Sequence, residues 1–282
     1  MSMDLKYVNH KGAVLDLSDW PYVLQSDHLF DYEWQYNEIN TGKRGGVISS
    51  FYKDARTTDA TICIHSMDDT EFESAMNRFF EVVEADIAAK IPGRLVLPDG
   101  YYLICYIVAS SDEGWRRGIR TDMKRVKLVS EYPWWCLDVL YRFEPGMSGI
   151  DENYEFLDFP IDFPLDFSNA GSAKVVFNNS IESAMFKMIM YGPAVNPYTR
   201  IGKALYRVDI ELKQSEWLII DSRDRTVMHH KAAGFSVPVF NSREKAEGVF
   251  QPIPNGMNRV QETNCYFDLT VYEGRSVPKW IL

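Results

Sequence analysis

The sequence predicts a mainly β fold with one long helix, built as two domains of the β-sandwich class. Three observations favour this fold class. Short segments in which apolar and polar residues alternate recur along most of the chain, separated by turns rich in Asn, Pro and Gly. One stretch alone has the three- and four-residue spacing of an amphipathic helix. With 282 residues, the chain is long enough for two domains of ordinary size.

The composition argues against several classes of protein. Hydrophobic residues make up 46% of the chain, which is enough for two cores and argues against disorder. The 40 acidic and 30 basic residues give a formal net charge of −10. Because affinity for nucleic acids rests on Lys and Arg at the phosphates, we expect no specific nucleic-acid binding. We also expect no membrane association, since no apolar run reaches about 18 residues. The start of the chain lacks the features of a secretory signal, so the 4 cysteines are expected to be buried, reduced thiols of a protein made in the cytosol.

The first element is a hairpin over about residues 33–55, around a Gly-rich turn at 40–46. Its apolar residues are Trp34, Tyr36, Ile39, Val47, Ile48 and Phe51. A protruding hairpin exposes backbone donors and acceptors at its edges, which can pair with a neighbouring molecule. We therefore predict an oligomer interface that contains Tyr36, Asn40, Gly42 and Gly45.

The helix is expected at about residues 70–90. Thr70 and Glu73 form a capping-box pattern, which predicts Thr70 as the N-cap. Pro92 ends the helical pattern because it cannot continue the hydrogen-bond ladder. The apolar stripe consists of Phe72, Met76, Phe79, Phe80, Val83 and Ile87. The helix is expected to pack this stripe on the first sheet.

A turn-rich segment near residues 143–157 divides the chain, so we expect a first domain over residues 1–145 and a second over residues 146–282. An Asp-Phe-Pro repeat over 158–167 opens the second domain. Its prolines exclude a helix interior and a central strand, which predicts an extended segment at a sheet edge or domain surface. Further on, apolar and polar residues alternate over 204–213 and 265–272, the pattern of half-buried strands.

Sequence motifs for catalysis, metal binding and nucleotide binding are weak. The histidines have no zinc-ligand spacing, and there is no nucleophile elbow, phosphate loop or dinucleotide fingerprint. We therefore predict that the protein is not an enzyme and has no catalytic residue, no metal site and no cofactor. Abundant carboxylates and the Trp134–Trp135 pair leave two alternatives open, a carbohydrate-binding protein and a glycosidase. The basic stretch from Arg116 to Lys127 is interpreted as a solvated strand face or an interface.

A series of short motifs resembles, in order and spacing over nearly the whole chain, one known family. The motifs are 7–12 (YVNHKG), 29–34 (LFDYEW), 92–95 (PGRL), 100–103 (GYYL), 130–135 (SEYPWW), 191–197 (YGPAVNP), 220–222 (IDS), 253–258 (IPNGMN) and 273–280 (EGRSVPKW). Together they are similar to the distal tail proteins of long-tailed phages, the siphophages, that infect Gram-positive bacteria, and to their prophage copies.

The resemblance implies a structural role. In that family the first domain is a β-sandwich with a helix and a hairpin, and it forms a homo-hexameric ring. The second domain is a galectin-like β-sandwich. Such a hub links the tail tube protein to the tail-tip or tail-associated protein, the baseplate and the receptor-binding proteins. The resemblance thus implies a component of the virion tail, assembled in the host cytoplasm. The alternative is a lectin-like, carbohydrate-binding protein of a host-adhesion device.

Overall fold

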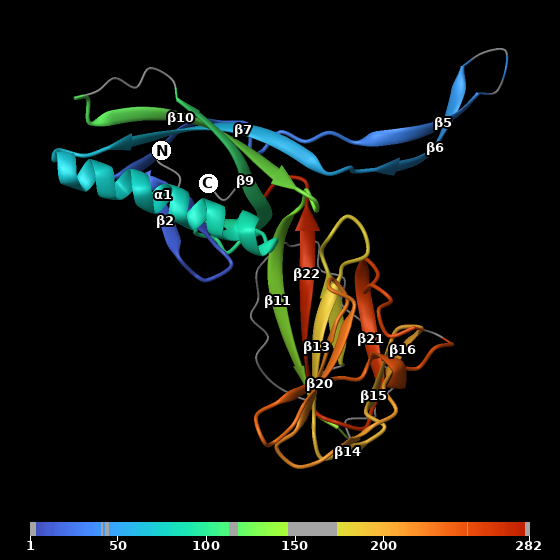
Figure 1. Cartoon of the computed structure of the whole chain (residues 1–282). Coiled ribbons are helices and arrows are strands. Elements are labelled where there is room, and N and C mark those ends of the chain that lie inside the picture. The colour runs from blue at the N-terminus through green and yellow to red at the C-terminus, as the bar shows by residue number, and fades with distance from the viewer. Residues whose placement is uncertain are drawn as a thin grey trace, which may run out of the picture. The chain divides into compact units, whose positions relative to one another are not determined.

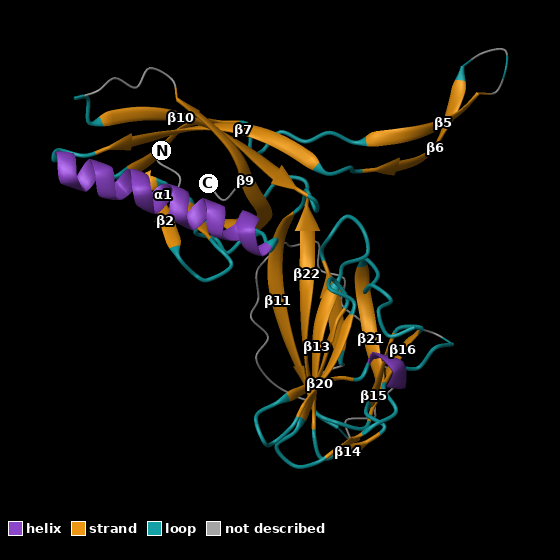
Figure 2. Ribbon diagram, viewed as in Figure 1, coloured by secondary structure: helices purple, strands orange, loops and turns teal. Residues whose placement is uncertain are grey.

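The computed structural model describes residues 4–40, 42, 45–112, 118–145, 174–246 and 248–279. Over these residues the protein is mainly β with one long helix, which confirms the predicted fold class (Figure 2). The chain divides into two compact units. The first unit is Met1–Leu137 with Gly274–Leu282, and the second unit is Asp138–Glu273. The Asp-Phe-Pro repeat over 158–167 lies outside the described residues.

The expected domain division between residues 145 and 146 stays a prediction. The compact units change between Leu137 and Asp138, within one strand, β11 (Trp135–Phe143). They also give Gly274–Leu282 to the first unit. Strand β11 (WCLDVLYRF) contains no Gly, Pro or Asn and so gives no sequence signal for a change of unit, whereas the turn-rich segment that follows it does.

The first unit is built on two sheets that share β9. Strand β9 pairs with β10, after which β7, β4 and β3 follow in order; it also pairs with β8, and through β8 with β1 and β2 (Figure 1). The strands are β1 (Lys6–Val8), β2 (Val14–Asp16), β3 (Ser18–Asp19), β4 (Tyr22–Asp27), β7 (Arg56–His65), β8 (Gly93–Val96), β9 (Tyr102–Asp112) and β10 (Thr121–Ser130). One hydrophobic cluster joins these strands to the helix.

Helix α1 (Asp69–Ala89) confirms the predicted helix and packs on β2, β7 and β9. Its buried face carries Phe72, Phe79 and Val83, as the stripe predicts, whereas Ile87 is 43% exposed. The predicted cap was wrong. The N-cap is Asp68, whose Oδ1 accepts hydrogen bonds from the backbone N–H groups of Thr70 and Glu71.

The physical reason is that an Asp two residues earlier offers a charged acceptor to the same free N–H groups at the start of the helix. Thr70 is thereby left inside the first turn. At the other end, Lys90 has a left-handed backbone with φ 56°, so the helix ends at Ala89, two residues before the Ile-Pro-Gly sequence.

The second unit is a β-sandwich. Its first sheet contains, in order, β20 (Ser236–Pro238), β19 (Thr226–His230), β18 (Trp217–Asp221), β13 (Phe186–Tyr191) and β22 (Phe267–Arg275), followed by β11. Its second sheet contains β12 (Val175–Asn178), β21 (Gly256–Thr263), β15 (Tyr198–Ile201) and β16 (Ala204–Arg207). Short strands β14 (Ala194–Val195) and β17 (Glu211–Leu212) pair with each other, and a short 3₁₀ helix covers Phe240–Ser242.

Side chains from both sheets share one core in this unit. Val176 and Ile201 of the second sheet belong to the same buried cluster as Phe186, Met188 and Leu218 of the first. Apolar faces of two sheets that meet in this way define a sandwich. The galectin-like character of the sandwich stays a prediction.

Candidate assembly interface

The predicted hairpin is present as β5 (Gln35–Asn40) and β6 (Gly46–Tyr52), a two-stranded sheet of its own. Figure 1 shows it reaching away from the other strands of the first unit. In the turn, Gly42 and Gly45 have φ values of 91° and 100°, a backbone region that favours glycine. The Asn40 Oδ1 atom accepts a hydrogen bond from the Gly42 N–H at 2.8 Å. Local turn chemistry therefore accounts for where the chain reverses.

The hairpin exposes six large hydrophobic side chains. They are Tyr36, Ile39, Val47, Ile48, Phe51 and Tyr52, with exposed fractions between 42% and 59%. Register places Tyr36 opposite Phe51 and Ile39 opposite Val47. Residues opposite each other share a face, while Tyr36 and Ile39, three positions apart on one strand, point to opposite faces. Each face of the hairpin thus carries an exposed apolar pair.

Such a hairpin has the features of an interaction site. A two-stranded sheet alone is marginally stable in water, and apolar side chains gathered on an exposed surface are typical of an interaction site. Its open strand edges add unpaired backbone groups. The structure brings all four predicted interface residues, Tyr36, Asn40, Gly42 and Gly45, to this one element. Their contact with a second copy stays a prediction.

The Trp134–Trp135 pair, which motivated the carbohydrate alternatives, is buried. Trp135 is 1% exposed and stacks on Phe30, with ring centroids 5.3 Å apart. Trp134 is 9% exposed and meets Trp34 edge to face at 5.4 Å. Both rings are covered because the two faces of the chain at this point pack, one on the core and the other in a smaller aromatic cluster. Neither ring is available as a sugar-stacking platform.

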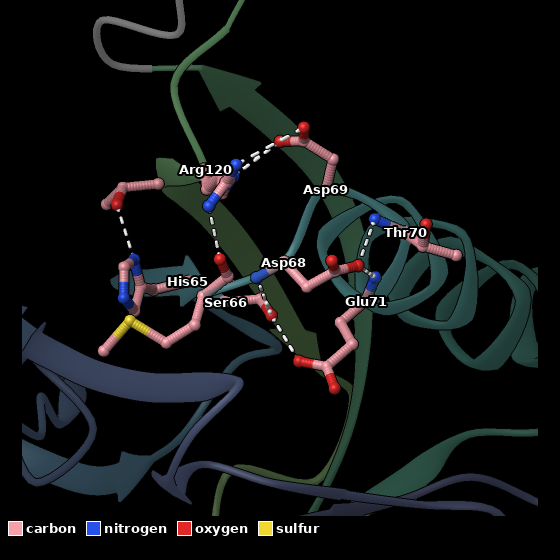
Figure 3. A network of polar contacts seen from close by, with 9 residues as sticks. His65, Ser66, Asp68, Asp69, Thr70, Glu71 and Arg120 are labelled. Atoms are coloured by element: carbon pink, nitrogen blue, oxygen red, sulfur yellow. Dashed lines mark hydrogen bonds and ion pairs between the residues drawn. The ribbon is translucent and has the colours of Figure 1, made fainter.

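The basic stretch makes ion pairs within the chain, so its interpretation as a solvated face holds only in part: Arg120 is 46% exposed, whereas Lys124 is buried. Near the start of β10, the Arg120 Nε atom lies 2.6 Å from Asp69 Oδ1, and its guanidinium also donates to the carbonyl of Met67. Figure 3 shows this contact beside the cap of α1, where the Ser66 hydroxyl donates to the Glu71 carboxylate at 2.8 Å. Arg120 therefore ties β10 to the first turn of the helix.

Lys124 lies deeper in the same strand. It is 3% exposed and its ammonium contacts the carboxylates of Asp112 and Asp122. Burial by itself lowers the pKa of Lys124, but hydrogen bonds to the two carboxylates outweigh burial and raise the pKa above its usual value. Arg125 and Lys127, on the alternate face, are exposed as expected. Arg116 and Arg117 lie outside the described residues.

A buried polar cluster joins the beginning of the chain to α1. The Asp86 carboxylate is fully buried and accepts hydrogen bonds from the Tyr7 hydroxyl at 2.6 Å and from the His10 backbone N–H at 2.9 Å. The His10 Nδ1 atom lies 2.6 Å from the same carboxylate. Burial and the hydrogen bond to Asp86 raise the pKa of Tyr7. The buried Asp86 carboxylate, which we call the clamp, therefore joins β1 and the residues after it to α1 through hydrogen bonds.

Neither a metal-binding cluster nor a membrane-spanning helix is found among the described residues. Within the described ranges, no set of three or more His, Cys, Asp or Glu side chains is placed to hold a metal ion. The helix over 69–89 does not combine the length and apolarity that crossing a membrane requires, and the rest of the described chain offers no other candidate. The four cysteines are buried, as predicted.

Comparison with known proteins shows the fold. No protein-family model matches the sequence, and no curated protein matches it. Among solved structures, the Dit protein of phage SPP1, described as a paradigm of the hub adsorption apparatus in phages that infect Gram-positive bacteria, matches with a TM-score of 0.62 and 9% identity over 96% of this chain and 99% of that one.

Two structures of the phage P2 baseplate in its activated conformation match as well. The calcium form gives a TM-score of 0.66 with 11% identity over 99% of this chain and 100% of the matched chain. The strontium form gives a TM-score of 0.64 with 12% identity over 97% of this chain and 99% of the matched chain. The chain therefore has, over nearly its full length, the fold of a phage hub protein and of a baseplate component.

Proposed function

We propose that the protein is a structural phage tail protein, a hub component at the distal end of the tail tube. The observation that carries this proposal is the hairpin, whose two faces expose apolar pairs and which has no second sheet to cover them among the described residues. The fold shared with the SPP1 hub protein and the P2 baseplate component supports it. The burial of the two tryptophans removes the sugar platform that favoured a lectin or a glycosidase.

In this proposal the hairpin of one copy docks on a different surface of the next copy. A contact between two unlike surfaces is heterologous, and repeated contacts of this kind close into a ring when the rotation between copies allows it. Six copies form the ring, as the family resemblance implies. The ring joins the tail tube protein on one side to the tail-tip protein and receptor-binding proteins of the baseplate on the other. The protein is non-enzymatic, uses no cofactor and belongs to the virion tail assembled in the host cytoplasm.

The test removes the turn of the hairpin. Replacing residues 40–46 by Asn-Gly keeps β5 and β6 connected through a two-residue turn. We expect the wild type to have the solution mass of a hexamer by light scattering and the variant to have a lower average mass at the same concentration, because it keeps the apolar pairs but loses the contacts of the turn. The melting temperature of the variant should stay close to that of the wild type, because none of the described residues within 40–46 belongs to either hydrophobic core. A variant that keeps the hexameric mass would contradict the proposed role of the hairpin.

A further inference from the structure

The root of the hairpin holds one ammonium group in an aromatic cage. Tyr32 and Trp34 precede β5, and Lys53 directly follows β6. The Lys53 Nζ atom lies 4.0 Å from the ring centroid of Trp134, 5.1 Å from that of Trp34 and 5.6 Å from that of Tyr32. It also donates a hydrogen bond to the Ser276 hydroxyl at 2.8 Å. The single ammonium therefore links one leg of the hairpin to the other leg and to two further segments of the first unit.

The geometry suits a cation specifically. Rings that face an ammonium within about 6 Å attract it through their negative π faces. Trp34 and Trp134 meet edge to face at 5.4 Å, so they present two walls of one cage. Trp134 is 9% exposed and directly precedes β11, which makes this wall part of the body of the first unit. Ser276 directly follows β22 and belongs to the segment Gly274–Leu282 of the first unit.

Small rotations at this root have large effects at the turn. Strands β5 and β6 pair with each other and with no other described strand, so their direction depends on the root. A six-residue strand extends about 20 Å. A rotation of about 20° at the root therefore displaces the turn by roughly 7 Å, more than the 4.0–4.5 Å over which apolar side chains remain in contact.

We propose that Lys53 is a positioning residue: its ammonium, held by Tyr32, Trp34, Trp134 and Ser276, sets the direction of the hairpin and thereby the geometry at which copies assemble. The second half of this statement rests on the proposed function. The first half concerns the single chain and stands without it. Lys53 makes no part of the apolar contact itself; it acts through the position of the hairpin.

The positioning is measured as a distance within one chain. Spin labels are placed at Glu38→Cys on the hairpin, outside its apolar pairs, and at Glu84→Cys on α1, both exposed positions, while the native cysteines are buried. Labelled protein is mixed with excess unlabelled protein so that distances within one chain dominate the signal. We expect a narrow distance distribution for the wild type, a distribution at least twofold broader for Lys53→Met, and a narrow one for Lys53→Arg, which keeps the cation.

Two further variants keep the test decisive. Lys127→Met removes an exposed lysine of β10 and should leave the distribution unchanged. Ser276→Ala removes the hydrogen bond but leaves the cage, and gives a milder broadening in a chain that folds even if Lys53→Met does not. Circular dichroism establishes folding in each case. A Lys53→Met distribution as narrow as that of the wild type overturns the proposal.

Assembly is measured separately by sedimentation. We expect Lys53→Met to weaken association at least tenfold while Lys53→Arg associates like the wild type. If Lys53→Met broadens the distance distribution but associates normally, the link from position to assembly is overturned. If the wild type itself never associates, the proposed hexamer is wrong, and the distance measurement still decides whether Lys53 positions the hairpin.

Discussion

Replacing the cross-strand pair Ile39 and Val47 by serine should weaken assembly without unfolding the chain. The two residues lie opposite each other near the turn of the hairpin and are 59% and 57% exposed. In the proposed ring they are buried by the neighbouring copy. The double variant Ile39→Ser, Val47→Ser keeps the hairpin length and the turn but removes one of its two apolar pairs.

The expected size of the effect follows from the exposed fractions. Full burial of an aliphatic side chain is worth about 1.5–3 kcal/mol. Because a little more than half of each side chain remains exposed in the single chain, docking gains about 1–2 kcal/mol per residue, or roughly 2–4 kcal/mol for the pair. At 1.4 kcal/mol per tenfold change, the dissociation constant of each contact rises by about 30- to 700-fold.

Sedimentation over a range of concentrations measures this constant. The matched control is Val195→Ser, which removes an apolar side chain that is 68% exposed on β14 of the second unit. We expect the control to associate like the wild type and both variants to melt close to it, because exposed substitutions usually change stability by about 0.5 kcal/mol or less. Equal dissociation constants for the double variant and the wild type would refute the reasoning from exposed area.

Three further predictions concern the anchors of the fold. Asp68→Ala should lower the melting temperature by about 2–4 °C in calorimetry and Thr70→Ala by clearly less, because the cap is Asp68; the reverse order would restore Thr70 as the cap. Tyr7→Phe should cost about 1–3 kcal/mol in urea unfolding, because the buried Asp86 carboxylate loses a donor, and a variant as stable as the wild type would count against the clamp. Hydrogen bonds from backbone N–H groups lower the pKa of Asp68 and of Glu216. The stability they contribute is present above the pKa values of the unfolded chain and is lost as pH falls through the lower folded values. Acid unfolding followed by circular dichroism should therefore begin below about pH 4.5, and full stability at pH 2 would contradict this.

Local patterns explain what the sequence predicted well. The helix over 69–89 and the hairpin strands over 35–40 and 46–52 follow from periodicity and turn residues within each segment. Tyr36, a predicted interface residue, is exposed because an apolar residue in a short hairpin has no core to enter; its role in an interface stays a prediction. These are properties of adjacent residues, so a single sequence contains them.

The contacts that could not be predicted from the sequence join residues that are far apart along the chain. Asp86 and Tyr7 are 79 residues apart, and Lys53 and Ser276 are 223 residues apart. No spacing rule connects such positions. Lys124 illustrates the same limit, because the strand alternation places it on the buried face although its charge favours the surface, and the carboxylates that make its burial tolerable become visible once the strands are paired. A buried charge is stable where it is paired and hydrogen-bonded.

The exposed apolar pairs of the hairpin and the fixed direction of its root are both required for copies to assemble in a controlled way. A hairpin with apolar pairs on both faces is a liability in a single chain, because exposed strand edges and apolar surface promote uncontrolled association. A heterologous contact removes that liability when the assembly closes, and produces open filaments when it does not. Closure requires each copy to meet the next at one fixed rotation, which a hairpin free to swing at its root cannot provide. The ammonium of Lys53, which follows β6, is bound by two rings that precede β5 and by Trp134 and Ser276 of the body of the first unit, and it supplies the restraint that the proposed closed ring demands.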